Sequence, residues 1–215
     1  MGEPDSDEPT FRRRAVVIAF GMVGIGLLAW GLRAEPGSGA FYTSTLALAV
    51  VWLLGGLLSG PVTLGWEMHD GRRRRPVLSA IIAGAVLAAV FVVGALVVRH
   101  IPVLRHRVAG VLDFARHGSW PIVLALTVAN GLAEEVFFRG GVQPALPERI
   151  RLPASVAIYA GVTLATGKVM LCFAAALLGV VVSLQRRATD GVLSPILTHV
   201  LWAVLMFIFL PLVIR

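Results

Sequence analysis

Charged residues and cysteines are scarce in this chain of 215 residues. Charged residues make up 14% of it and hydrophobic residues 57%, proportions that fit a polytopic membrane protein and leave no room for a separate soluble domain. Cys172 is the single cysteine and lies in an apolar run, which excludes an internal disulfide and favours a buried structural thiol. One membrane domain is therefore expected.

Lysine is also scarce: Lys168 is the sole lysine, and the other basic residues are arginines or histidines. The formal net charge is +7, which in a soluble protein could indicate nucleic-acid binding. Here the arginines cluster between apolar runs, as topology determinants do. We therefore predict membrane lipids as partners of these segments, and no binding of nucleic acid.

Apolar runs recur along the chain at lengths suited to membrane helices. Residues 1–14 are predicted to be a disordered tail, and residues 15–215 a single membrane domain. Within that domain we predict an all-α, polytopic membrane helix bundle of about seven spans, at 15–32, 41–64, 77–98, 120–140, 153–166, 169–184 and 196–214. The fifth run would be only about 21 Å long, short of the roughly 30 Å hydrocarbon core, so it must be wrapped by other helices or stop part way.

The segment 99–119 mixes arginines and histidines with apolar residues at helical spacing, which predicts an amphipathic surface helix. With the N-terminus inside, four other basic segments all fall on the cytoplasmic side, as the positive-inside rule expects. These segments are 12–14, 72–75, 139–151 and 186–187. Segment 99–119 then lies on the opposite side, a conflict that an even number of crossings there would resolve.

Two adjacent carboxylates and an arginine end the fourth apolar run. A charge near the bilayer centre costs roughly 2.5 to 3.5 kcal/mol on insertion scales, so Glu134, Glu135 and Arg139 must face protein or water. Glu135 precedes Arg139 by four residues, the order in which a carboxylate and a cation pair best on a helix. Glu134 lies about 100° round the helix, in line with Asn130, which leaves it free for chemistry. The alternative is a set of charges near lipid headgroups, with Arg139 snorkelling outward.

The same stretch carries a resemblance to a known family. Residues Glu134 to Gly140 resemble EExxxR with a following Gly, the first motif of the CPBP family of intramembrane proteases. That family includes the CAAX prenyl endopeptidases and bacteriocin-processing or self-immunity proteins. The likeness covers roughly residues 115–210, which we take as a CPBP-like core.

Two further family motifs are present only in part. The second, an aromatic residue followed four residues later by His, aligns with Tyr159 and Thr163. The third, a His followed four residues later by Asn or a similar polar residue, aligns with His199 and Ala203. Tyr159 is expected to be a packing residue, and His199 could instead simply hydrogen-bond a backbone carbonyl or Glu134.

The resemblance implies catalytic roles for the four residues that match the motifs. Glu134 would be the general base that activates water, Glu135 and Arg139 its orienting pair, and His199 the electrostatic stabiliser of the tetrahedral intermediate. A catalytic zinc needs three protein ligands and these side chains make a crowded set, so we predict no bound metal and no other cofactor. Loss of one oxyanion donor typically costs about 10² to 10³ in rate, so the residues at the other motif positions predict a slow or altered enzyme.

We therefore predict a CPBP-type intramembrane endopeptidase in the cell membrane, which cleaves a membrane-associated peptide or protein. The alternative is a catalytically impaired pseudoprotease of the same fold that acts as a membrane binding or immunity protein, an alternative motivated by Thr163 and Ala203. A third hypothesis is a small transporter in which Glu134, Arg139 and His199 relay protons or ions.

Overall fold

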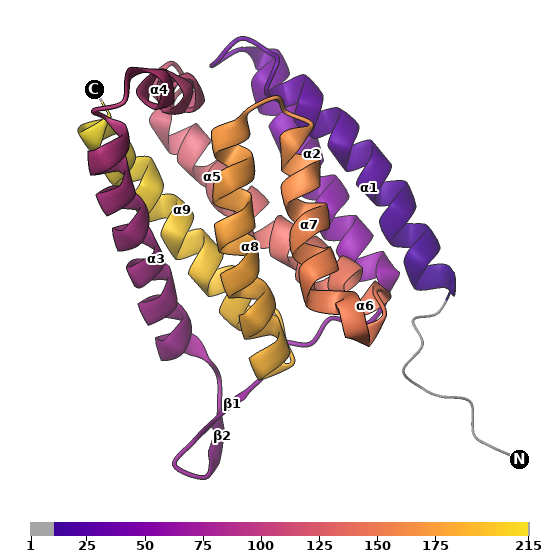
Figure 1. Cartoon of the computed structure of the whole chain (residues 1–215). Coiled ribbons are helices and arrows are strands. Elements are labelled where there is room, and N and C mark those ends of the chain that lie inside the picture. Colours follow the sequence, from indigo (N-terminus) through magenta and orange to yellow (C-terminus); the bar gives the residue numbers. More distant parts are fainter. Residues whose placement is uncertain (1–10, 215) are drawn as a thin grey trace, which may run out of the picture.

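The computed structural model describes residues 11–214, apart from the side chains of residues 114 and 115. Helices running up and down form a bundle, which confirms the predicted all-α polytopic class (Figure 1). The elements are α1 (Phe11–Gly31), α2 (Gly39–Ser59), β1 (Glu67–His69), β2 (Arg72–Arg74), α3 (Val77–Val98), α4 (Pro102–Arg116), α5 (Trp120–Glu135), a π-helix η1 (Val136–Val142), α6 (Gln143–Ala145), a 3-10 turn η2 (Glu148–Ile150), α7 (Arg151–Leu164), α8 (Val169–Thr189) and α9 (Leu193–Val213).

Six of the described helices are long and apolar enough to cross a membrane. They are α1, α2, α3, the continuous run Trp120–Ala145, α8 and α9. The predicted count of about seven spans also included the run 153–166, which forms α7. With 14 residues, α7 is too short to cross the roughly 30 Å core and packs along α8, as wrapping by another helix requires.

The first helix begins at Phe11, so residues 11–14 are helical and do not belong to a tail. Helix formation there continues the apolar helix into the arginines by one turn, and Arg12 reaches the carbonyl of Leu58 at the end of α2. Residues 1–10 of the predicted tail lie outside the described residues. The assignment of 15–215 to one membrane domain stays a prediction.

A β-hairpin between α2 and α3 was not predicted. Its strands pair Glu67 with Arg74 and His69 with Arg72, and its turn is Asp70-Gly71, with φ of 49° and 72°. Asp-Gly is the preferred sequence for such a two-residue turn, because both positions need positive φ. The signal was therefore in the sequence, in a segment otherwise interpreted only as an arginine cluster.

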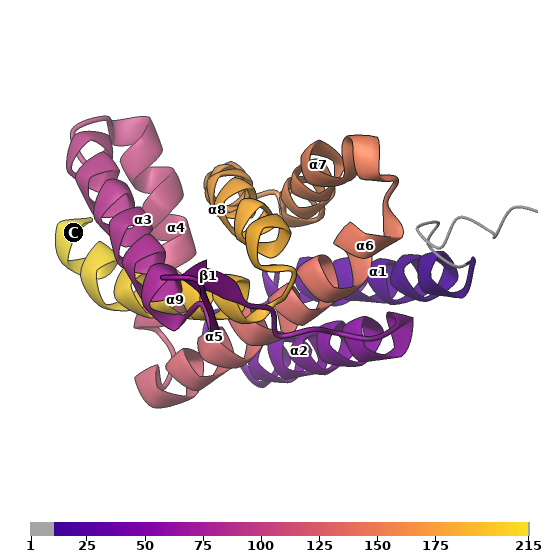
Figure 2. The ribbon, with the colours of Figure 1, turned by 90° about the horizontal axis from the view of Figure 1, so that it is seen from below.

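The core lies where α5 and η1 cross the middle of the bundle. Trp52 of α2 packs against Phe137 and Phe138 of η1 with tilted rings, whose centroids are 4.4 and 5.3 Å apart. Gly56 allows this contact, since a Cβ there would lie 2.5 Å from the carbonyl oxygen of Val136. Viewed along the bundle, α7 and α8 lie side by side on one side of α5 (Figure 2).

The basic segments gather at one end of the molecule. The start of α1, the hairpin, α6 and the end of α8 all lie at the lower end of Figure 1. Helix α4 is the predicted amphipathic helix, and it lies at the opposite end, with 15 residues and no second crossing beside it. Extra crossings therefore do not resolve the conflict between segment 99–119 and the positive-inside rule, and the membrane side of each end stays a prediction.

Candidate active site

Glu135 stands at the centre of a buried polar cluster. Its side chain is fully buried, and Oε1 accepts a hydrogen bond from Arg139 Nη1 at 3.2 Å. The predicted i,i+4 pairing is thus confirmed, and Arg139, with no exposed surface, does not snorkel to headgroups. The same Oε1 lies 2.7 Å from Nδ1 of His199, so one carboxylate oxygen joins α5 to both η1 and α9.

Arg139 is enclosed by three elements. Beyond the pair with Glu135, Nη2 donates to the carbonyl of Gly179 on α8 at 3.4 Å, and the guanidinium lies 4.6 Å from the ring centroid of Tyr159 on α7. A Cβ at Gly179 would fit tightly at this crossing, because it would lie 3.3 Å from the tyrosine ring and 3.4 Å from the guanidinium. The arginine therefore ties η1 to α7 and α8 as well as to Glu135.

The motif arginine lies on a π-helix and not on a regular α-helix. Single π-turns occur often at functional sites, because the wider turn shifts side chains relative to the preceding helix. The first motif thus straddles a change of helix type, with Glu134 and Glu135 ending α5 and Arg139 in the middle of η1. Sequence spacing alone assumed 3.6 residues per turn and missed this change.

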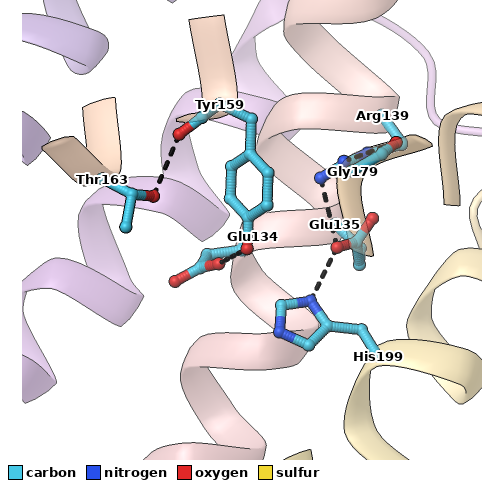
Figure 3. Close-up of polar contacts among 7 residues, drawn as sticks. All are labelled: Glu134, Glu135, Arg139, Tyr159, Thr163, Gly179 and His199. Carbon is cyan, nitrogen blue, oxygen red and sulfur yellow. Dashed lines mark hydrogen bonds and ion pairs between the residues drawn. The ribbon is translucent and has the colours of Figure 1, made fainter. Parts of the chain in front are cut away.

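Glu134 faces away from the ion pair, as its position on the helix predicted. It is half-buried, and its Oε2 accepts a hydrogen bond of 2.6 Å from the Tyr159 hydroxyl. Figure 3 shows Glu134 beneath the tyrosine ring and Glu135 to the right of it, between Arg139 and His199. Tyr159 therefore does more than pack against Phe138, and its position as the aromatic residue of the second motif was the signal for this contact.

His199 is buried on α9 beside both glutamates. Its contact is with Glu135 and not with Glu134 or a backbone carbonyl, which were the partners considered from the sequence. Because Nδ1 is engaged by Glu135, Nε2 is the nitrogen left for another partner, and this nitrogen faces the backbone at Gly131.

The two positions that depart from the family motifs contribute no catalytic group. Thr163 donates its hydroxyl to the carbonyl of Tyr159, one turn back on its own helix, at 2.9 Å. Ala203, one turn beyond His199, has no polar side-chain atom. Among residues 11–214, no three His, Cys, Asp or Glu side chains are grouped so as to hold a metal ion, and the absence of a metal stays a prediction.

Comparison with known families bears on this geometry directly. Residues 116–205 match the family described as type II CAAX prenyl endopeptidase, Rce1-like. This match confirms the resemblance to the CPBP family, and it spans the first motif, Tyr159 and His199. No curated protein and no solved structure matches the chain.

The Rce1-like segment therefore holds every residue of the buried cluster. The family indicates an intramembrane protease of the CAAX or CPBP type, and the six apolar helices make the chain a multi-pass membrane protein. A membrane-embedded protease implies a peptide or protein substrate at the membrane.

Proposed function

We propose that the chain is an intramembrane endopeptidase that hydrolyses a membrane-associated peptide or protein in the cell membrane. The observation that supports this most strongly is the meeting of Glu134, Glu135, Tyr159 and His199 from three separate helices. Polar groups on membrane helices are costly unless they face a shared site. The match to CAAX prenyl endopeptidases makes prenylated C-terminal peptides the first substrates to test.

Glu134 is the general base in this proposal. The Tyr159 hydroxyl engages Oε2, which fixes the carboxylate and leaves Oε1 to accept a proton from a water molecule. The resulting hydroxide attacks the carbonyl carbon of the scissile peptide bond. When the tetrahedral intermediate collapses, the proton held by Glu134 passes to the nitrogen of the leaving amine.

His199 stabilises the developing oxyanion through Nε2–H. Glu135 holds Nδ1, so the ring is oriented and Nε2 remains for the substrate. Arg139 is the cationic partner of Glu135, whereas the described hydrogen bond of Glu134 is to the Tyr159 hydroxyl.

The test is peptide cleavage by the purified protein in detergent, with a library that includes prenylated peptides. Glu134→Gln keeps the shape of the side chain and removes the base, so we expect cleavage to fall by about 10² or more. Glu148→Gln, at an exposed glutamate outside the cluster, is the matched control and is expected to cleave normally. Equal cleavage by wild type and Glu134→Gln would reject this function.

A pseudoprotease is the second candidate, and one observation favours it. The hydroxyl of Thr163 is committed to its own helix, so the second motif supplies no acid, base or oxyanion donor at that position. If the chain is a pseudoprotease, the fold binds or shields a membrane peptide without cleaving it. Glu134→Gln should then leave the cellular phenotype of the wild-type gene intact. Loss of the phenotype by this one substitution would argue against the second candidate.

A further inference from the structure

A second polar layer lies one helical turn beyond the arginine. Gln143 follows Arg139 by four residues, and its Nε2 donates to the carbonyl of Ser183 at 3.2 Å. Arg139 makes the same kind of contact to Gly179, four residues before Ser183. The chain after Glu135 therefore contacts α8 through two successive polar layers, and the second lies nearer the basic end of the bundle.

Helix α7 adds a third member to this layer. α7 and α8 pack antiparallel, with the Tyr159 ring beside Gly179. Four residues toward the basic end from that crossing are Ser155 on α7 and Ser183 on α8, so antiparallel packing places them at one level. Both serines are fully buried, and Gln143 is 3% exposed.

Each of these three side chains has a polar atom that lacks a hydrogen-bond partner in the described part of the chain. Within residues 11–214, Gln143 Oε1, Ser155 Oγ and Ser183 Oγ are buried and find no hydrogen-bond partner. Several other helical serines and threonines among the described residues bond the carbonyl three or four residues back, as Ser44 and Thr163 do. The hydroxyls of Ser155 and Ser183 do not make this hydrogen bond within their own helix. A buried polar group without a partner is costly unless water satisfies it.

We infer that Gln143, Ser155 and Ser183 form a water-binding layer, through which water passes from the basic end of the bundle to Arg139 and Glu135. The layer lies close to that end, because Gln143 begins the three-residue helix α6 and Ser155 is in the first turns of α7. The buried Nε of Arg139 and Oε2 of Glu135 also lack partners among the described residues. These two atoms extend the set of buried polar atoms without partners from the layer to Glu135.

Water in this layer would reach the polar cluster at Glu135, the neighbour of Glu134 in the chain, and its use as the water that Glu134 activates rests on the function proposed above. Access of water to the layer does not, so it is tested without any assay of catalysis. The probe is Ag⁺, a small ion that reacts with thiols and enters along water but not through dry apolar packing. Cys172→Ala provides the cysteine-free parent, in which single cysteines are placed at Ser155 and Ser183.

Two matched controls carry cysteine at equally buried sites. Ser44→Cys replaces a fully buried serine that bonds its own helix, and Val182→Cys replaces the fully buried apolar neighbour of Ser183. Protein in liposomes is exposed to Ag⁺ from one side, and unreacted thiols are then counted by maleimide labelling after denaturation. Thermal unfolding shows which variants keep the midpoint of the parent, and Gln143→Cys replaces any serine variant that does not.

We expect the layer cysteines to react at least about tenfold faster than the controls, because ions avoid the dry interior. We also expect the reaction to require Ag⁺ at the basic end. Reaction rates equal to those of Ser44→Cys and Val182→Cys would overturn the inference, and so would reaction only from the end that carries α4. Neither result bears on cleavage by Glu134, so a failure of this inference is distinct from a failure of the proposed function.

Discussion

Replacing the buried arginine of the Glu135–Arg139 pair should be far more damaging than replacing an arginine that pairs, at the same four-residue spacing, with an exposed carboxylate. Arg139→Met removes the partner of Glu135, a carboxylate with no exposed surface, and leaves its charge beside His199 alone. Breaking a buried pair in this way costs about 3–5 kcal/mol of unfolding free energy. The lost contacts to the Gly179 carbonyl and the Tyr159 ring add to the effect.

Arg186 provides the control for this prediction. It forms an i,i+4 pair with Asp190 at 2.8 Å, but the aspartate side chain is 92% exposed. Water already satisfies that carboxylate, so Arg186→Met should cost about 1 kcal/mol, most of it from the bond of its Nε to the Arg139 carbonyl. The comparison separates the effect of burial from the effect of losing an arginine.

A double-mutant cycle then isolates the ion pair. Glu135→Gln alone leaves Arg139 charged and buried, while Glu135→Gln with Arg139→Met leaves neither charge unpaired. The double variant should therefore be more stable than the sum of the single effects predicts, by about 2 kcal/mol. Unfolding free energies would be measured by titration with a denaturing detergent in mixed micelles.

Two results would refute this reasoning. One is an Arg139→Met variant that is destabilised no more than Arg186→Met. The other is additivity of the two cluster substitutions to within about 0.5 kcal/mol, the value expected of independent sites. Either would mean that the buried charges are not coupled as the geometry indicates.

Three further predictions concern the tyrosine beside the proposed base, the glycines of the helices and the two incomplete motifs. Tyr159→Phe removes the hydroxyl that orients the proposed base, and cleavage should fall by about tenfold or more while the unfolding free energy drops by about 1 kcal/mol. Gly56→Ala should lower the unfolding midpoint, since its Cβ would meet a backbone carbonyl of η1, whereas Gly26→Ala, with nothing within 4 Å, should raise or preserve it. Thr163→His with Ala203→Asn restores both family motifs and should raise peptide cleavage by about 10²; unchanged turnover by the restored variant would show that these positions do not limit the rate.

The adjacent glutamates show how the fold gives two like residues different surroundings. Glu135 is buried between Arg139 and His199, which both contact its Oε1, so its charge is compensated. Glu134 is half-buried and bonds only to the neutral Tyr159 hydroxyl among its described contacts. Environments that differ in this way separate the role of a proton carrier from that of a fixed charge.

The sequence by itself determined the features that depend on neighbours along the chain. Apolar runs predicted the membrane helices, and the shortness of the run 153–166 predicted the dependent helix α7. The four-residue spacing of Glu135 and Arg139 predicted their contact, because such residues share a helix face. The Asp-Gly pair at 70–71 also indicated a β-hairpin turn, although the segment was interpreted only as an arginine cluster.

Only the tertiary structure decided which distant groups meet. It turned His199 toward Glu135 instead of Glu134, and it brought the Tyr159 hydroxyl to Glu134. Each of these contacts depends on how two helices cross, and crossings are set by packing, as where Gly56 lets α2 approach η1. Hydrophobic periodicity specifies which face of a helix is buried, but not how deeply it is buried or which helix it packs against. The residues of the site could therefore be predicted from the sequence, but the contacts between them could not.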